Sequence, residues 1–348
     1  MSKVFLHPKN PINPINHASF LIVRTDRLGD VVLTLPMASA IKKASPNARV
    51  VFLAREYTRP IVERSTGIDQ VLCIEDGIGL LRLIRLMRKA NANVVLLPSP
   101  RFPLALAAFL ARIPIRVSTG YRWYSFLFNR RIFEHRKTAE RHESEYNLRM
   151  LSTIGIKADE NAVAEIRLRS EEISSVEYWL KENLGSEQPK YIVLHAVSGG
   201  STNEWAPERF IELTKILQER INCDIVLTGI ESDRAKLSAI CEEIHTHLYI
   251  GKSIAELAEL LANAAAVVSV GTGPGHLSSA LGTPTVGLFP LPKPISKERW
   301  GFRGRFVISL APPPIANCPD CKSCTCMERI DAFRVADEIE KLILMRND

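Results

Sequence analysis

The chain contains 348 residues, of which 46% are hydrophobic and 24% are charged, and its formal net charge is +7. This length exceeds the range that one hydrophobic core serves, so two domains are expected in a protein of ordinary globular composition. No run of about 20 apolar residues is present, and residues 1–19 lack the apolar core of a secretion signal, which argues against membrane-spanning and secreted proteins. We therefore expect a cytoplasmic protein.

Short apolar runs alternate with amphipathic stretches through the first half of the chain. Strands are predicted over residues 20–24, 49–54, 70–74 and 94–97, and helices over residues 30–44, 57–65, 77–90 and 104–111. This alternation implies right-handed crossovers in a parallel sheet, so the first half is expected to form a Rossmann-like unit. Another helix is predicted over residues 142–154.

The alternation restarts in the second half, after a stretch that contains a charged helix over residues 171–183. Strands are predicted over residues 191–195, 224–227, 266–270 and 285–288, and helices over residues 207–220, 232–244 and 254–262. We place a first domain at residues 1–165, a bridge at 166–189, a second Rossmann-like domain at 190–330 and a C-terminal helix at 331–348. The pattern leaves open which domain the last helix packs against.

The loop Arg24-Thr-Asp-Arg-Leu-Gly-Asp30 follows the first predicted strand. Ligands of open parallel sheets bind beyond the carboxyl ends of the strands, so this loop is expected to line a cleft. A carboxylate at Asp30 lies near a helix N-terminus, where it commonly caps backbone N–H groups. The same position, with Arg24, Asp26 and Arg27 close by, also suits a general base that accepts a proton from an alcohol.

A second candidate site is the glycine-rich segment from Val270 to Val286, which reads as strand, turn, short helix and strand. Gly271, Gly273 and Gly275 are expected to adopt backbone angles closed to other residues and to leave room for a phosphate at the helix N-terminus. The spacing matches neither the dinucleotide fingerprint nor the P-loop, so nicotinamide and ATP chemistry are not expected. A plain strand-to-helix turn is the alternative.

Positive charge is concentrated in residues 101–141, where nine Arg or Lys residues stand against two Glu residues. Such a segment suits a phosphorylated glycolipid, a membrane surface or nucleic acid, or forms a solvated basic face. No nucleic-acid fold motif accompanies it, so no nucleic-acid partner is expected. Arg122 and its aromatic neighbours are equally consistent with contact to an acceptor or membrane and with half-buried packing.

Four crowded cysteines lie near the C-terminus, at Cys318, Cys321, Cys324 and Cys326. Four thiolates suffice for zinc or an iron–sulfur cluster, but a nine-residue loop is short for wrapping a tetrahedral site. We expect no metal there, and the sequence leaves the question open. A disulfide framework is not expected in a long chain with an odd number of cysteines.

Several separate motifs together resemble glycosyltransferase family 9, the bacterial lipopolysaccharide heptosyltransferases, over nearly the whole chain. The motifs are the segment Ile22 to Pro36, the helix with His142, Tyr146, Leu148 and Gly155, the segment Trp205-Ala-Pro-Glu-Arg-Phe210, the segment Gly273 to Leu288, and the ending Cys326-Met-Glu-Arg-Ile330. The resemblance implies an α/β GT-B architecture, in which two Rossmann-like domains face each other across a cleft. It further implies an inverting sugar transfer without an obligatory metal or other cofactor.

The resemblance also assigns roles to individual residues. The family's catalytic aspartate falls on Asp30, as the base that deprotonates an acceptor hydroxyl. The first domain would hold a lipopolysaccharide core or related anionic glycolipid at the inner membrane surface, through Arg24, Asp26, Arg27 and Arg122. The second would hold a nucleotide diphosphate sugar, ADP-heptose or a relative, through Ser198, Gly199, Gly200, Asn203, Thr228, Gly229, Glu231, Gly271, Thr272, Gly273, Pro274, Gly275 and His276. His276 is alternatively a packed or capping residue, and Glu231 is alternatively a helix cap, with no ligand contact in either case.

Three positions depart from the family pattern on the donor side. Asn203 stands where lysine is usual, Gly271 where aspartate is usual, and the usual aromatic–Gly–Pro turn reads Phe289-Pro-Leu-Pro292. These departures leave the donor sugar open. Two alternatives are a nucleotide-sugar 2-epimerase of the same architecture and a catalytically degenerate member that binds glycolipid.

Overall fold

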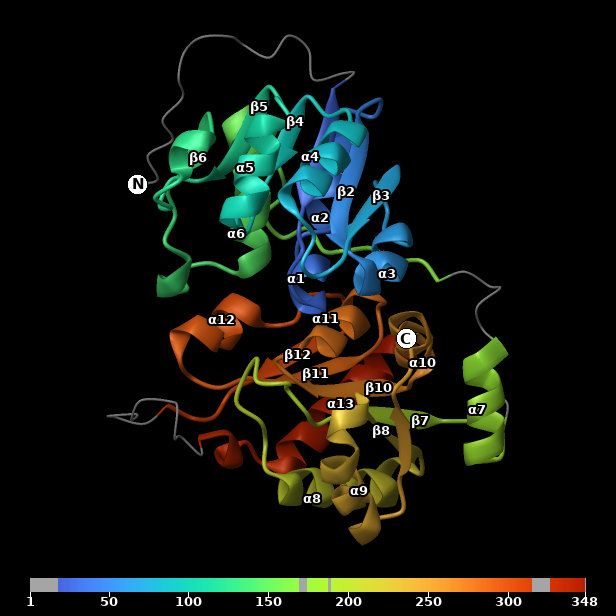
Figure 1. Ribbon diagram of the computed structural model, residues 1–348. Coiled ribbons are helices and arrows are strands. Elements are labelled where there is room, and N and C mark those ends of the chain that lie inside the picture. Colours follow the sequence, from blue (N-terminus) through green and yellow to red (C-terminus); the bar gives the residue numbers. More distant parts are fainter. Residues whose placement is uncertain (1–17, 169–173, 187–188, 315–325, 348) are drawn as a thin grey trace. The chain divides into compact units, whose positions relative to one another are not determined.

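The computed structural model describes residues 18–168, 174–186, 189–314 and 326–347. The chain divides into two compact units, of which unit 1 comprises residues 1–136 and 141–167 and unit 2 comprises residues 137–140 and 168–348. Each unit contains a parallel six-stranded sheet with helices packed against it (Figure 1). The predicted α/β class with two Rossmann-like units is therefore confirmed.

The sheet of unit 1 has the strand order β3-β2-β1-β4-β5-β6. Its strands are β1 (Ser19–Val23), β2 (Arg49–Arg55), β3 (Gln70–Ile74), β4 (Val94–Leu96), β5 (Ile115–Thr119) and β6 (Arg130–Ile132). Its helices are α1 (Leu28–Val32), α2 (Pro36–Ala44), α3 (Arg59–Glu63), α4 (Leu80–Lys89), α5 (Phe102–Leu110) and α6 (Glu143–Arg149).

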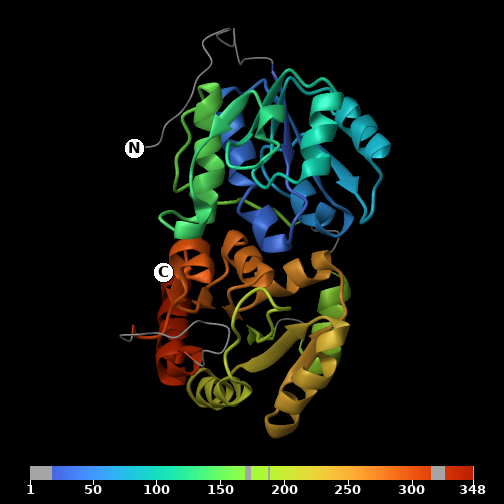
Figure 2. The same cartoon turned by 60° about the vertical axis from the view of Figure 1, so that its left-hand side comes forward.

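Alternate strand residues of unit 1 pack against helices on opposite faces of the sheet, as the two-residue repeat of a strand requires. Leu21 and Val23 of β1 belong to a buried cluster with Leu83 of α4 and Leu104 of α5. Figure 2 shows the α4–α5 pair and α6 on opposite sides of this sheet. The sheet is thus covered on both faces, as parallel sheets require.

The sheet of unit 2 has the order β12-β11-β10-β7-β8-β9. Its strands are β7 (Tyr191–His195), β8 (Asp224–Gly229), β9 (His247–Ile250), β10 (Ala266–Val270), β11 (Thr285–Leu288) and β12 (Val307–Leu310). Its helices are α7 (Ser174–Leu184), α8 (Pro207–Ile221), α9 (Arg234–Glu243), α10 (Ile254–Asn263), α11 (Gly273–Ala280), α12 (Lys297–Trp300) and α13 (Ala332–Asn347). The last helix packs in unit 2, where Val335 and Ile339 join the buried core of that sheet.

All eight predicted strands are present, whereas β5, β6, β9 and β12 were not predicted. Three of these four lie at sheet edges, and β5 and β6 contain arginines that interrupt the apolar pattern. The helix predicted over residues 30–44 is in fact two helices, because Pro36 starts a new one and lacks the N–H that would continue the first. The first helix begins at Leu28, so Asp30 lies inside its first turn.

Candidate functional site

The first candidate site lies where the strand order of unit 1 changes direction. Strand β1 pairs with β2 on one side and with β4 on the other, so the loops after β1 and β4 border the crevice between them. Arg101, after β4, donates a hydrogen bond from Nη2 to Oδ1 of Asp26, after β1, at 2.9 Å. The two loops expected to line a site are therefore joined.

Arg24 is the centre of this site, because its guanidinium faces three carboxylates. It is only 3% exposed and forms ion pairs with Asp30, with Asp26 (Nε to Oδ2, 3.0 Å) and with Glu143 of α6 (Nη1 to Oε1, 3.7 Å). Burial alone would lower the pKa of Arg24, but the three carboxylates raise it above its ordinary value. The guanidinium thus stays charged and holds the carboxylates in place.

Asp30 has a raised pKa despite its contact with Arg24. Burial is the largest cause, and repulsion from Asp26 and Glu143 adds to it, while Arg24 acts in the opposite direction. Its side chain is 19% exposed, so the carboxylate retains access to a ligand. A partly exposed carboxylate with a raised pKa is a stronger base than an ordinary aspartate.

The structure bears on the interpretation of Asp30 as a helix cap. Arg27 is the N-cap of α1 and makes no side-chain capping bond, while the Asp30 carboxylate pairs with Arg24. The backbone of Asp30 is also held, because its carbonyl accepts a bond from Thr34 Oγ1 at 2.8 Å. Asn147 of α6 donates to the carbonyl of Leu33 at 3.1 Å and so braces the end of α1. The expectation that Asp30 serves as a helix cap is therefore wrong.

Sequence reasoning missed Glu143, Arg136 and Arg101, which complete the charged network around Arg24. Arg136 pairs with Glu143 and also donates to Oδ1 of Asn147 at 3.0 Å. Glu143 is more than a hundred residues from Arg24 in the chain, so no local spacing could connect the two. Only the structure shows that Glu143 is buried, and buried carboxylates are almost always paired.

The remaining acceptor candidates, Arg27 and Arg122, do not take part in the ion-pair network around Arg24. Arg27 is exposed at the start of α1. Arg122 is exposed after β5, next to Trp123, whose ring stacks on Phe102 with centroids 5.0 Å apart. The structure therefore gathers Arg24, Asp26 and Asp30, whereas no contact joins Arg122 to them among the described residues.

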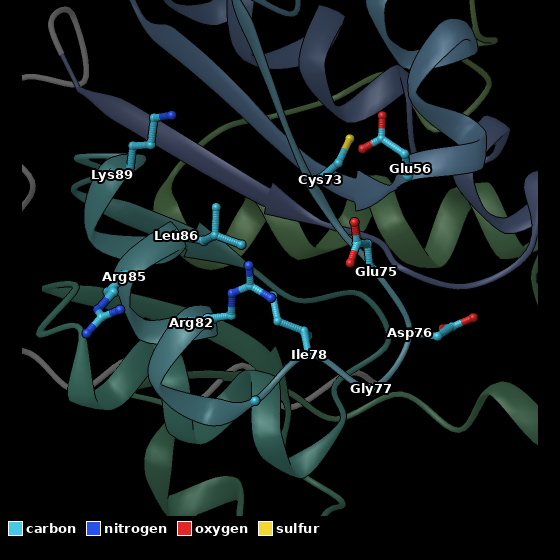
Figure 3. Close-up of a pocket in the computed structure, with 11 residues that line it drawn as sticks. Glu56, Cys73, Glu75, Asp76, Gly77, Ile78, Arg82, Arg85, Leu86 and Lys89 are labelled. Atoms are coloured by element: carbon cyan, nitrogen blue, oxygen red, sulfur yellow. The ribbon is translucent and has the colours of Figure 1, made fainter.

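A pocket of about 450 Å³ in unit 1 lies between β3 and α4 (Figure 3). It includes none of the predicted site residues. Its walls carry both charges, with acidic groups from β3 and its flanks and basic groups from α4; the lining residues are Glu56, Cys73, Glu75, Asp76, Gly77, Ile78, Gly79, Arg82, Arg85, Leu86 and Lys89. In Figure 3 Glu56 and Cys73 lie close together, whereas Arg85 points away from them.

The second candidate site lies in unit 2, at the carboxyl ends of three adjacent strands. Strand β7 pairs with β8 on one side and β10 on the other, which again marks the change of direction in the strand order. The loops after these strands contain nearly all the predicted donor-binding residues. After β10, Thr272 is the N-cap of α11, whose first-turn N–H groups at Gly273 and Gly275 lack helical partners. Pro274 between them has no N–H.

Two of the three glycines after β10 are explained by packing rather than by unusual backbone angles. Gly271, Gly273 and Gly275 are not among the glycines with positive φ, so that expectation is wrong. A Cβ at Gly275 would meet the Phe302 ring at 2.0 Å, and one at Gly271 would meet the Phe289 ring at 2.7 Å. The aspartate usual in the family at Gly271 would clash with Phe289.

In the loop after β7, two backbone N–H groups already donate hydrogen bonds to side chains of the same loop. Gly199 and Gly200 have φ values of +53° and +75°, which make a tight turn. The N–H of Ser198 donates to Oε1 of Glu204 at 2.7 Å, and the N–H of Gly200 donates to Oγ of Ser198 at 3.1 Å. These two groups are therefore committed within the loop, which weakens it as an anion cradle. Asn203 in the same loop is half-buried.

Three other donor-side residues make contacts within the unit. Thr228 shares a hydrogen bond with Nδ1 of the buried His195 at 2.9 Å, and burial lowers the pKa of His195 to about 4, so this histidine is neutral near pH 7. Glu231 is exposed and pairs with Arg234 at 2.5 Å, and that hydrogen bond lowers its pKa. His276 is buried, with its ring edge-on to Phe302 at 4.9 Å. Gly229 ends β8, and a Cβ there would meet Leu237 at 2.7 Å.

The cysteine cluster falls mostly on residues 315–325, so Cys318, Cys321 and Cys324 lie outside the described residues, while Cys326 is buried in unit 2. In the part of the chain that the structure describes, no group of three or more metal-binding side chains is assembled. Within the same residues, no helix combines the length and apolarity that crossing a membrane requires.

The two parallel α/β units, each with its loops at a change in strand order, have the GT-B architecture. The chain belongs to glycosyltransferase family 9 (heptosyltransferase), whose family model matches residues 80–312.

Relatives and solved structures agree with this assignment. A Haemophilus influenzae protein whose name goes no further than glycosyltransferase is 27% identical over 292 residues, which cover 80% of this chain and 84% of that protein. Lipopolysaccharide heptosyltransferase 3 of Escherichia coli K12 is 25% identical over 283 residues, covering 75% and 79%. The fold is similar to that of E. coli ADP-heptose lipopolysaccharide heptosyltransferase II, with a TM-score of 0.76, 18% identity and coverage of 95% and 100%.

Proposed function

We propose that this glycosyltransferase moves a heptose, with inversion, from a nucleotide diphosphate to a lipopolysaccharide core or related anionic glycolipid. The observation that carries the proposal is the partly exposed Asp30, with a raised pKa, held at the change in strand order of unit 1. The names of the E. coli relatives support heptose and lipopolysaccharide as the chemistry to test first.

In this reaction Asp30 is the general base. Its carboxylate takes the proton of an acceptor hydroxyl while that oxygen bonds to the anomeric carbon of the donor sugar. The bond from that carbon to the diphosphate oxygen breaks, and the nucleoside diphosphate leaves with the electron pair. Arg24 orients the carboxylate through its ion pair, and general base catalysis of this kind is worth about 10²–10⁴-fold in rate.

The leaving diphosphate would be held by the second unit without a metal ion. The first-turn N–H groups of Gly273 and Gly275, together with the dipole of α11, are suited to an anion. The other donor-side candidates, at Thr228, Glu231, His276 and the Ser198–Asn203 loop, would contact the sugar or nucleoside. Charge that develops on the diphosphate oxygens would thus be met by fixed donors.

The acceptor side would use cations that remain available. Arg27 and Arg122 are exposed, whereas Arg24 and Asp26 are bound in the buried network. An acceptor carried by lipid would require peripheral contact with a membrane, and we propose the cytoplasmic face of the inner membrane.

The test is transfer by the purified full chain, with ADP-heptose and a heptose-deficient lipopolysaccharide core as substrates. Release of ADP, together with an acceptor mass increase of one heptose, is the expected result. Consumption of the donor without acceptor, with an epimeric sugar as product, would establish an epimerase instead. If calorimetry detects no binding of any nucleoside diphosphate, the protein is a non-catalytic binder. A thermal-shift screen of ADP-, GDP-, UDP- and dTDP-sugars identifies the donor.

A further inference from the structure

Helix α5 is apolar on its outer as well as its inner face. Its sequence, Phe-Pro-Leu-Ala-Leu-Ala-Ala-Phe-Leu, contains no polar side chain. Leu104, Ala105, Ala107 and Ala108 are buried, whereas Phe102, Phe109 and Leu110 are 38–45% exposed. A surface helix ordinarily carries polar residues on its outer face. The outer face of α5 is therefore unusual for a helix in contact with water.

The 3-10 helix Ser125–Leu127 and the residues before it extend this apolar surface. Trp123 is 74% exposed and stacks on Phe102, with ring centroids 5.0 Å apart. Phe126 is 64% exposed in the same segment. We call the side chains of Phe102, Phe109, Leu110, Trp123 and Phe126 the aromatic face. Exposed aromatic residues in a contiguous group mark an interaction surface.

The chain segment that carries the aromatic face has only basic charged residues, although Arg101, next to Phe102, pairs with Asp26 of another segment. From Gly77 to Phe133 the chain contains ten Arg or Lys residues and no Asp or Glu. Helix α4 packs beside α5 (Figure 1), and Arg88 donates from Nη2 to the carbonyl of Leu110 at 3.2 Å. Arg85 on α4 and Arg112 after α5 are exposed, and the guanidinium of Arg116 lies over the ring of Phe109 at 5.3 Å.

We propose that the aromatic face docks unit 1 onto a membrane surface that contains anionic phospholipids. Tryptophan and phenylalanine insert at the boundary between headgroups and acyl chains, while arginines around them bind lipid phosphates. Because this part of the sequence contains no acidic residue, its charge is complementary to anionic lipid headgroups. The apolar side chains on the outer face of α5 are the ones that would insert among the acyl chains. The inference rests on the proposed function, because a lipid-borne acceptor lies at the same surface.

Flotation with vesicles tests the docking directly, with the full chain and two lipid compositions. Wild type is expected to float with an equal mixture of phosphatidylcholine and phosphatidylglycerol but not with phosphatidylcholine alone. Phe109→Ser with Leu110→Ser removes apolar contact, and Arg85→Gln with Arg112→Gln removes two cations. Each pair is expected to weaken binding about tenfold or more, because two inserted apolar side chains are lost in the first and two cations near an anionic surface in the second.

Matched control variants test whether the effects are specific to the aromatic face or follow from losing any exposed aromatic side chain or any two positive charges. Tyr178→Ser removes an aromatic side chain that is 68% exposed in unit 2, and Lys215→Gln with Arg334→Gln makes the same change in net charge there. Both are expected to float like wild type. Trp123→Phe is expected to keep binding but to lose the quenching by brominated lipids, which reports insertion of Trp123 itself. Melting temperatures verify that every variant is folded.

Several outcomes would overturn the docking proposal. Equal flotation of wild type and both double variants would do so, as would absence of wild-type flotation. Loss of a dimer in Phe109→Ser with Leu110→Ser would assign the aromatic face to a second copy of the chain, and binding to RNA in place of vesicles would assign it to nucleic acid. Transfer to a deacylated, soluble core distinguishes the two proposals. If the protein transfers the sugar but does not bind vesicles, only the docking proposal is wrong. If it binds vesicles but transfers sugar to no acceptor, only the proposed function is wrong.

Discussion

The buried guanidinium of Arg24 pairs with the carboxylate of Asp30 while it also faces Asp26 and Glu143, which pair in turn with Arg101 and Arg136. Arg24 cannot fully offset burial and mutual repulsion, and the pKa of Asp30 is therefore raised. The same arrangement that fixes the position of Asp30 thus also increases its basicity.

Asp30→Asn removes the proposed base while keeping its shape. We expect kcat to fall by on the order of 10²–10⁴-fold, with donor affinity unchanged. The melting temperature should change little, because Arg24 retains Asp26 and Glu143 and the cost of burying the ionised Asp30 disappears. Asp76→Asn, at an exposed carboxylate in unit 1, is the matched control and should leave kcat unchanged. Normal turnover by Asp30→Asn would show that another group accepts the proton.

Glu143→Gln tests whether Glu143 acts on the reaction through Asp30. Its negative charge raises the pKa of Asp30, so its removal should lower that pKa. A base must be deprotonated, and kcat/KM falls as the pH drops through the pKa of the base. The acid limb of the kcat/KM profile should therefore move to lower pH.

Glu145→Gln supplies the control for this shift, because Glu145 also lies on α6 but pairs with Arg141 at 4.0 Å. Its profile should match wild type. A purely structural role for Glu143 would reduce activity and stability without moving the acid limb. An unmoved limb in Glu143→Gln would therefore contradict the electrostatic coupling.

His195→Gln tests a linkage between pH and stability in unit 2. Burial lowers the pKa of His195 to about 4, whereas an unfolded histidine titrates near 6.5. The unfolded state binds the proton more tightly, so His195 contributes stability above about pH 6.5 that is lost as the pH falls toward 4. Wild type should lose roughly 3 kcal/mol of unfolding free energy over this range through His195 alone. Glutamine does not titrate, so the variant should lose less in urea unfolding measured at a series of pH values. Parallel losses in the two proteins would contradict the assignment.

The elements that could be predicted from sequence are those with an uninterrupted pattern. The central strands β1, β7 and β10 are continuous apolar runs, and their period identifies them directly. The edge strand β6 carries Arg130 and Arg131 in three residues, and its pairing with β5 depends on tertiary contacts that no local pattern records.

In the candidate site, too, residues within a short motif could be predicted from sequence, whereas residues brought together by the fold could not. Asp30 and the glycines after β10 were recognised because each belongs to a compact motif. Glu143 was missed because its relation to Arg24 is created by the fold. The reason for the glycines was also misjudged, since Gly275 is required by the Phe302 ring, whose position is set by residues far along the chain.

Gly275→Ala tests this packing explanation, because the added methyl group would lie 2.0 Å from the Phe302 ring. Overpacking in a core of this kind costs about 1–3 kcal/mol, so the variant should unfold at lower urea concentration. Phe302→Leu in the same chain should relieve part of that cost, and a double-mutant cycle measures the relief. Gly79→Ala is the control for an added methyl group, since a Cβ there meets nothing within 4 Å; because Gly79 is the N-cap of α4, this variant should cost only the loss of a preferred capping residue and show no coupling to Phe302→Leu. If the cycle gives no coupling between positions 275 and 302, the glycine is required for a reason other than the ring, and ligand contact at the N-terminus of α11 becomes the explanation to test.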